Sequence, residues 1–169
     1  MAESSWLRIR PAIVADARVL ASVHLNTVVV AYADIIPAGV PALSEETLIQ
    51  EWQAAFEDPS HKAFLAEDNG KPVGTVAVRT DPDFDGVGQL RRLYVLPARW
   101  ARGAGTSLYE AALAALKGDH YPEAGLWVFE KNVRARHFYE RRGWTLVPDA
   151  VVEWPEQVVE VRYRLVIGG

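Results

Sequence analysis

One stretch of the sequence decides the fold: Leu93-Tyr94-Val95-Leu96-Pro97-Ala98-Arg99-Trp100-Ala101-Arg102-Gly103-Ala104-Gly105-Thr106-Ser107-Leu108. It predicts a strand, then a basic loop with two glycines, then a helix. Glycines let backbone N–H groups approach an anion closely, and the N-terminus of the following helix adds unpaired donors and a partial positive charge. Arg99 and Arg102 would add charge-assisted contacts. The stretch therefore predicts an anion site, although two glycines in such a turn can also serve tight geometry alone.

Two other glycine-rich motifs do not fit this loop. The dinucleotide-binding fingerprint needs a third glycine three positions after the second, where this chain has Leu108. A Walker-type phosphate loop needs Gly-Lys-Ser or Gly-Lys-Thr, and the sequence contains neither. A nucleotide-binding enzyme is therefore a weaker alternative, which protection by NAD or ATP would reveal.

The segments around this loop predict a mixed α and β fold in a single domain over residues 1–169. Strands are expected at 6–10, 61–67, 72–80, 89–95, 126–129 and 159–167, and helices at 14–32, 45–56, 105–118 and 132–142. The pair Asn69-Gly70 is a strong hairpin signal, which predicts antiparallel pairing of the second and third strands. A Rossmann fold would alternate strand and helix from its start, and this order does not.

Composition excludes several classes of function. The net charge of −4 argues against a nucleic-acid or anionic-membrane surface, because such binding needs clustered lysine and arginine. The chain has no cysteine, so it has neither a disulfide framework nor a thiol nucleophile, and its four histidines are scattered without metal-ligand spacing. The start lacks the pattern of a signal peptide, and no later run is expected to span a bilayer. We expect a cytoplasmic protein without a metal cofactor.

A second segment carries a further pattern: Leu126-Trp127-Val128-Phe129-Glu130-Lys131-Asn132-Val133-Arg134-Ala135-Arg136-His137-Phe138-Tyr139-Glu140-Arg141-Arg142-Gly143-Trp144. Together with the glycine loop, it resembles the GNAT superfamily of N-acetyltransferases. The family pattern Arg/Gln-x-x-Gly-x-Gly/Ala falls on 100–105, where both glycines match and Trp100 replaces Arg or Gln. The pattern Asn-x-x-Ala-x-x-Phe-Tyr-x-x-x-Gly-Phe falls on 132–144, where Trp144 replaces the final Phe.

The resemblance implies a central, mostly antiparallel sheet flanked by helices and splayed at an acyl-CoA site. It also implies which residues bind acetyl-CoA: Tyr94, Val95, Arg102, Gly103, Ala104, Gly105, Thr106, Asn132 and Tyr139. A backbone N–H near Tyr94 or Val95 would polarise the thioester carbonyl, and Tyr139 would protonate the departing thiolate. Asn132 also has a structural interpretation as a helix N-cap, and Tyr139 as a core aromatic. Because no cysteine or serine-elbow motif offers a covalent carrier, we expect direct attack by an amine.

The base for such a reaction is not assigned by the sequence. Many relatives carry a Glu where this chain has Gln89, which cannot take a proton. Three candidates for the base remain open: a water chain, Glu130, and an acid of the Asp81, Asp83 and Asp85 cluster. The pattern of that cluster is more typical of a solvated turn. Arg91 and Arg92 are expected to be surface charges of their strand. Trp52 and the Tyr32 loop are candidates to line an acceptor pocket.

The alternative function is a catalytically degenerate acyl-CoA sensor or interaction module, which Gln89 motivates. The acceptor has no portable motif, so small molecules and peptides with an amine both remain open. Homodimerisation is an expectation from the family alone.

Overall fold

The computed structural model describes residues 6–154 and 158–168, which form seven strands, four α-helices and two short 3-10 helices. The strands are β1 (Leu7–Ala12), β2 (Lys62–Asp68), β3 (Lys71–Thr80), β4 (Val87–Val95), β5 (Glu123–Phe129), β6 (Thr145–Glu153) and β7 (Val159–Val166). The helices are η1 (Val14–Asp16), α1 (Ala17–Ala31), α2 (Glu45–Ala55), η2 (Pro97–Arg99), α3 (Ala104–Gly118) and α4 (Val133–Glu140).

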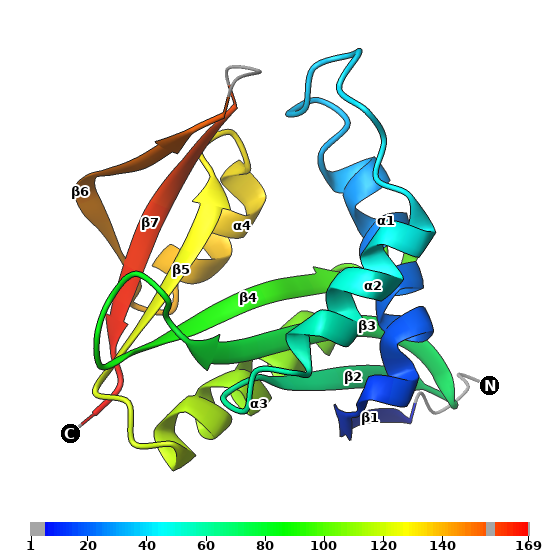
Figure 1. Ribbon diagram of the computed structural model, residues 1–169, viewed down its shortest axis with the longest axis horizontal. Coiled ribbons are helices and arrows are strands. Elements are labelled where there is room, and N and C mark those ends of the chain that lie inside the picture. Colours follow the sequence, from blue (N-terminus) through cyan, green and yellow to red (C-terminus); the bar gives the residue numbers. More distant parts are fainter. Residues whose placement is uncertain (1–5, 155–157, 169) are drawn as a thin grey trace.

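The strands form one mixed sheet in the order β1-β2-β3-β4-β5-β7-β6. Neighbouring strands pair antiparallel, except that β4 and β5 pair parallel. Helices α1 and α2 lie over one side of the sheet and α3 lies over the other, while α4 sits beside β5 (Figure 1). This is the mostly antiparallel sheet with flanking helices that the family resemblance implies.

The hairpin between β2 and β3 follows from its two turn residues. Asn69 and Gly70 have φ angles of 50° and 76°. Two successive left-handed residues make a type I′ turn, whose twist matches that of the flanking strands. The predicted Asn-Gly hairpin is therefore confirmed.

The sheet opens between β4 and β5, as the family resemblance implies. Their pairing comprises only Val87 with Glu123, Gly88 with Ala124 and Gln89 with Gly125. Beyond that point, β4 has a bulge: Arg92 and Leu93 lie opposite the single residue Val76 of β3, and Arg92 has a φ of 55°. A bulge bends its strand and strengthens the local twist. The backbone edge of β4 from Leu90 onward consequently has no ladder with β5.

Apolar side chains pack on both faces of the sheet because successive strand residues point to opposite sides. On the α3 face, Leu108 packs in one cluster with Val76, and both side chains are fully buried. On the α1 and α2 face, Trp52 packs in another cluster with Leu65 and Ala77. These two cores fix the position of β4 and of the two helix ends beside it.

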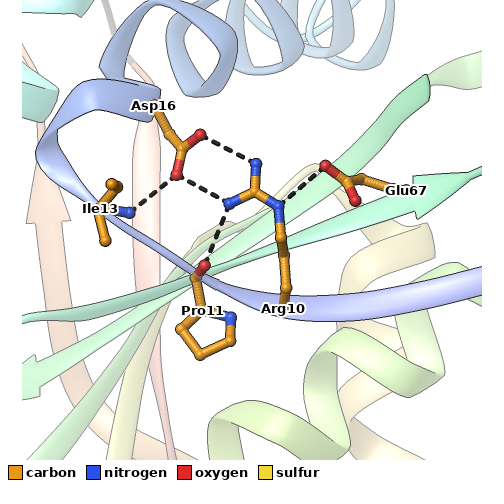
Figure 2. A network of polar contacts seen from close by, with 5 residues as sticks. All are labelled: Arg10, Pro11, Ile13, Asp16 and Glu67. Carbon is orange, nitrogen blue, oxygen red and sulfur yellow. Dashed lines mark hydrogen bonds and ion pairs between the residues drawn. The ribbon is translucent and has the colours of Figure 1, made fainter. Parts of the chain in front are cut away.

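An ion-pair network ties the N-terminal strand to the start of α1 (Figure 2). The guanidinium of Arg10 donates to both carboxylate oxygens of Asp16 at 2.9 Å, to Glu67 of β2 at 2.9 Å and to the Pro11 carbonyl at 3.2 Å. Asp16 also accepts the backbone N–H of Ile13 at 2.9 Å. The Arg10 hydrogen bonds lower the pKa of Asp16. Asp16 therefore anchors the helix entry through Arg10.

The segment Val14–Ala31 is long and apolar enough to cross a bilayer by length and composition alone, contrary to the expectation from sequence. Its apolar character has another cause. Leu20 and Ala21 are fully buried in the cluster that contains Trp52. The core helix of a soluble protein meets the same criteria, so this segment is weak evidence for a membrane.

Candidate active site

A cavity of about 720 Å³ lies where β4 parts from β5. Its walls come from the end of α1, the last residues of β4, the η2–α3 connection and α4. It contains most of the residues predicted for the site: Tyr94, Val95, Gly103, Gly105, Thr106, Asn132 and Tyr139. Two segments of the chain, 94–106 and 132–139, thus meet around one cavity.

Arg102 and Ala104, also predicted for the site, do not line this cavity. They border a smaller one of about 290 Å³, together with Arg99, Asn69 and other residues. Arg102 is exposed, whereas Ala104 is buried as the first residue of α3. From this position Ala104 can offer its backbone N–H, but the Arg102 side chain lies with the smaller cavity.

The glycine turn has the backbone geometry of an anion site. Gly103 is the N-cap of α3 with a φ of 90° and a ψ of −12°, a left-handed conformation that favours glycine. As a glycine, Gly103 has no side chain that could cap the first N–H groups of α3. The first N–H groups of any α-helix lack intrahelical partners and carry the positive end of its dipole. The N-terminus of α3 therefore presents donors beside the cavity.

Arginine side chains give the cavity positive charge: Arg99, Arg134, Arg141 and Arg142 line it. Arg142 is held in place by hydrogen bonds to Thr106 Oγ1 at 2.9 Å and to the Phe138 carbonyl at 3.0 Å. Sequence reasoning gave no role to the three arginines at 134, 141 and 142. Their spacing of seven and eight residues would put them on one face of the helix that the sequence predicts over 132–142, and that spacing is the available signal. In the structure α4 ends at Glu140, and Arg141 and Arg142 follow it in a turn.

Trp100 occupies the position where the family motif has Arg or Gln, and its indole contacts both the end of β4 and Arg134. Its Nε1 donates to the Val95 carbonyl at 2.7 Å, at the end of β4. The guanidinium carbon of Arg134 lies 3.7 Å from the centroid of the Trp100 ring. Such a stack is worth roughly 0.5–2 kcal/mol. Trp100 therefore fixes the strand end and positions a cation at the cavity wall.

Tyr139 projects from α4 into the cavity and is only 8% exposed. Its ring makes edge contacts with Phe138 and Trp144 at centroid distances of 5.4 and 5.8 Å. Burial raises the pKa of Tyr139, and the nearby phenol of Tyr94 raises it further. A phenol in this environment stays protonated at neutral pH, which suits a proton donor.

Asn132 caps α4 and also borders the cavity. Its side chain accepts the backbone N–H of Ala135 at 3.2 Å, which confirms the N-cap of α4. The same residue lines the cavity. Capping therefore fixes the side chain at the cavity wall without excluding a ligand contact.

Gln89, which stands where many relatives carry the base, and the acids suggested in its place are all poorly placed for that role. Gln89 is buried, and its Oε1 accepts from Arg79 at 2.8 Å. Asp81 is not solvated as predicted: it is 3% exposed and forms a buried ion pair with Arg162 at 2.8 Å. Asp83 and Asp85 are exposed turn residues, and Glu130 is exposed after the end of β5. None of these acids lines the cavity.

The prediction that Arg91 and Arg92 are surface charges is also wrong. The Arg92 side chain is 10% exposed, pairs with Glu51 at 3.4 Å and lies over the Trp52 ring. Burial lowers the pKa of Arg91 to about 10. Arg91 lies opposite Ala77, which packs in the cluster on the α1 and α2 face, so the two side chains share that face. Arg92 follows at the bulge, and its guanidinium lies over Trp52 of α2.

His24 lies behind the cavity wall and supports it. Its ring stacks on Tyr94 with centroids 4.4 Å apart. Burial, together with the charges of Arg92 and Arg91, lowers the pKa of His24 to about 3. His61 is similarly buried, in edge contact with Phe56, and its pKa falls to about 4. Both histidines are neutral at physiological pH.

Comparisons with known proteins agree with this geometry. Residues 26–144 match the model of the acetyltransferase (GNAT) family. An "uncharacterized N-acetyltransferase" of Archaeoglobus fulgidus is 38% identical over 79 residues, which are 44% of this chain and 54% of that protein. The match thus spans about half the length of that curated relative.

Solved structures share the fold across nearly the whole chain. An acetyltransferase of Thermus thermophilus has a TM-score of 0.72 at 22% identity, covering 95% of this chain and 96% of that one. The PaiA N-acetyltransferase of Thermoplasma acidophilum, solved with coenzyme A, has a TM-score of 0.72 at 19% identity, covering 95% and 99%. The family match includes both the glycine turn and the Asn132 to Trp144 segment. The chain therefore belongs to the GNAT family of acetyltransferases.

Proposed function

We propose that this protein transfers the acetyl group of acetyl-CoA to a primary amine of a small molecule or peptide. One observation carries the proposal: a single cavity joins the glycine turn at Gly103, the cationic side chain of Arg142 and the buried phenol of Tyr139. An anion-binding end and a proton donor in one cleft are what a phosphorylated thioester substrate requires. The coenzyme A complex of the PaiA N-acetyltransferase, which has the same fold, supports the choice of thioester.

The residues at the N-terminus of α3 fit a diphosphate. The backbone N–H groups of Gly103 to Thr106 would bind its oxygens, and Arg134 and Arg142 would add charge-assisted contacts. A Cβ added at Gly103 meets no heavy atom within 4 Å, so the turn is open. Arg102 has no place in this arrangement beyond a contribution to the surrounding charge.

Groups on the edge of β4 and on α4 would then carry out the acetyl transfer. A backbone N–H near Tyr94 or Val95, on the β4 edge that β5 leaves unpaired, would polarise the thioester carbonyl. The amine nitrogen would form the new bond to the carbonyl carbon as the C–S bond breaks. Tyr139 would give its proton to the sulfur. The amine attacks directly, because the chain has no cysteine to carry the acetyl group.

Two assays test this proposal. A thermal-shift titration should show stabilisation by acetyl-CoA and none by NAD or ATP, because a ligand that binds only the folded state raises the melting temperature. Thiol release over a panel of amines should then identify acceptors, with intersecting lines in a two-substrate analysis. Binding without any turnover would instead identify an acyl-CoA sensor, and parallel lines would refute direct attack.

A further inference from the structure

Buried polar atoms without hydrogen-bond partners are concentrated in one region, between α1, α2 and the sheet. They are His24 Nδ1, Trp52 Nε1, both ring nitrogens of His61, Thr75 Oγ1 and Arg92 Nη1. In the part of the chain that the structure describes, one further buried side-chain atom of this kind occurs, Nη1 of Arg162. Buried polar atoms in proteins nearly always have partners, so this concentration points to a polar group that binds here.

These five residues, the polar cluster, adjoin one another around Trp52. The Trp52 ring meets the rings of His24 and His61 at centroid distances of 6.4 and 6.2 Å. The guanidinium carbon of Arg92 lies 4.4 Å from the centroid of the same ring. Helices α1 and α2 therefore enclose the cluster together with β4.

The polar cluster reaches the wall of the acyl-CoA cavity at Tyr94. The ring of Tyr94, which lines the cavity, stacks on His24 with centroids 4.4 Å apart. Thr75 lies opposite Tyr94 in register, so the two side chains share one face of the sheet. Leu93 lines the cavity as well, and Arg92 precedes it directly in β4. Arg92 is thus set back from the cavity wall by one position of the strand.

Positive charge at the polar cluster exceeds negative charge. Among the residues that the structure describes, Glu51 is the only carboxylate within ion-pair distance of Arg79, Arg91 or Arg92. Its contact with Arg92 is long, at 3.4 Å, and its side chain is 47% exposed. Arg79 donates to the neutral amide of Gln89 at 2.8 Å. Since a buried guanidinium is stable only when it is well paired, these cations favour an additional anion.

We propose that Arg91 and Arg92 bind a carboxylate of the acceptor, and that the acceptor is therefore an amino acid. Guanidinium groups bind carboxylates through paired N–H donors, and two adjacent cations strengthen the contact. Arg92 is already oriented, because its guanidinium lies over Trp52 and its Nη2 meets Glu51. Its Nη1 remains as a donor for the ligand. The inference rests on the proposed acetyl transfer and narrows the acceptor of that reaction.

The positions along β4 suit a small molecule that carries both an amine and a carboxylate. The backbone N–H proposed to polarise the thioester lies near Tyr94 or Val95, two or three positions after Arg92. Strand residues advance by about 3.3 Å each, so the separation along the strand is roughly 7–10 Å. An acetyl carbonyl at one end and a carboxylate at the other leave room for the few atoms that join the amine to the carboxylate in an amino acid.

The test compares amino acids with their carboxamides as acceptors in thiol-release assays with acetyl-CoA. The probes are L-α-amino acids and ω-amino acids, each beside its own carboxamide. The wild type should use the acid with a kcat/KM at least roughly 10-fold above that of the amide, as expected for hydrogen bonds to a charged group. In Arg92→Gln, KM for the acid should rise roughly 10- to 100-fold, while kcat/KM for the amide changes little. Calorimetric affinity for acetyl-CoA should be unchanged.

The control variant is Arg18→Gln, which removes an exposed arginine of α1 and should keep the wild-type preference for acids. Equal use of acids and carboxamides by the wild type would overturn the inference and leave acetyl transfer intact. An equal loss with both acceptors in Arg92→Gln would also overturn it. No thiol release with any amine would instead overturn the proposed function.

A second variant decides the question if Arg92→Gln fails to fold. Arg91 is only half-buried, so Arg91→Gln is the milder change. A selective rise of KM for the acids in Arg91→Gln would support carboxylate binding. An equal change for acids and carboxamides would contradict it.

Discussion

The guanidinium of Arg162 lies against the α-carbon of Gly125, at the last residue pair that joins β4 to β5. A Cβ added at Gly125 would stand 2.2 Å from Nη2 and 2.8 Å from Cζ of Arg162. Arg162 in turn is 3% exposed and bound to Asp81. The absence of a side chain at Gly125 therefore makes room for a buried cation at the point where the sheet opens.

Replacing Gly125 with alanine should destabilise the fold, because Arg162 cannot retreat without breaking its ion pair. Overpacking costs about 1–3 kcal/mol, and we expect the upper end of that range. Urea unfolding measures the change. The control is Gly118→Ala in α3, whose Cβ meets nothing within 4 Å and should stabilise slightly. Equal stability of both variants would show that Arg162 is free to move.

Removing the partner of Arg162 should cost more. Asp81→Ala leaves a buried guanidinium without its carboxylate, and broken buried pairs lose about 3–5 kcal/mol. Asp85→Ala removes an exposed acid from the same turn and should change stability by less than about 0.5 kcal/mol. Denaturant midpoints compare the two. A similarly small loss of stability in both variants would contradict the buried ion pair and would indicate that Asp81 is solvated, as the sequence suggested.

Loss of the Tyr139 hydroxyl should reduce turnover and leave coenzyme binding intact. In Tyr139→Phe we expect kcat to fall by about 10² or more, since general acids contribute roughly 10²–10⁴. Tyr109→Phe is the matched control. Its hydroxyl accepts from the Trp144 indole at 2.9 Å, so its loss should reduce stability by about 1 kcal/mol without reducing kcat. An unchanged kcat in Tyr139→Phe would contradict a role as proton donor and would indicate that Tyr139 is only a core aromatic residue.

The buried histidines predict a loss of stability in mild acid. In the unfolded chain a histidine binds a proton below about pH 6.5, whereas folded His61 does so only below about 4. The unfolded state thus binds more protons between these values, and stability falls as the pH drops through that window. His61→Phe should flatten this part of the profile, and His137→Gln, at an exposed site, should not. Parallel profiles for wild type and His61→Phe would contradict burial of a neutral ring.

Local patterns explain why much of the site was predictable. The left-handed residue at Gly103, the N-cap at Asn132 and the turn at Asn69-Gly70 each depend on a few consecutive residues. Tyr139 lies in the same short segment as Asn132, so one local pattern makes both of them candidates for the site. Such features need no knowledge of distant contacts.

Long-range contacts were not predictable in this way. Asp81 and Arg162 are 81 residues apart in the sequence, and no local pattern joins them. The bounds of β6 were not predicted either. Its register slips between Leu146 and Val151, and Asp149 has a φ of 60°, which breaks the alternation that marks a strand.

The binding of acetyl-CoA at the glycine turn is tested most directly by calorimetric titration of Gly103→Asp. A carboxylate there would repel the diphosphate and strain a backbone with a φ of 90°, so the dissociation constant should rise roughly 100-fold or more. Gly86→Asp adds the same charge at an exposed, left-handed glycine away from the cavity and should bind as the wild type does. Wild-type affinity in Gly103→Asp would contradict the placement of the coenzyme at this turn.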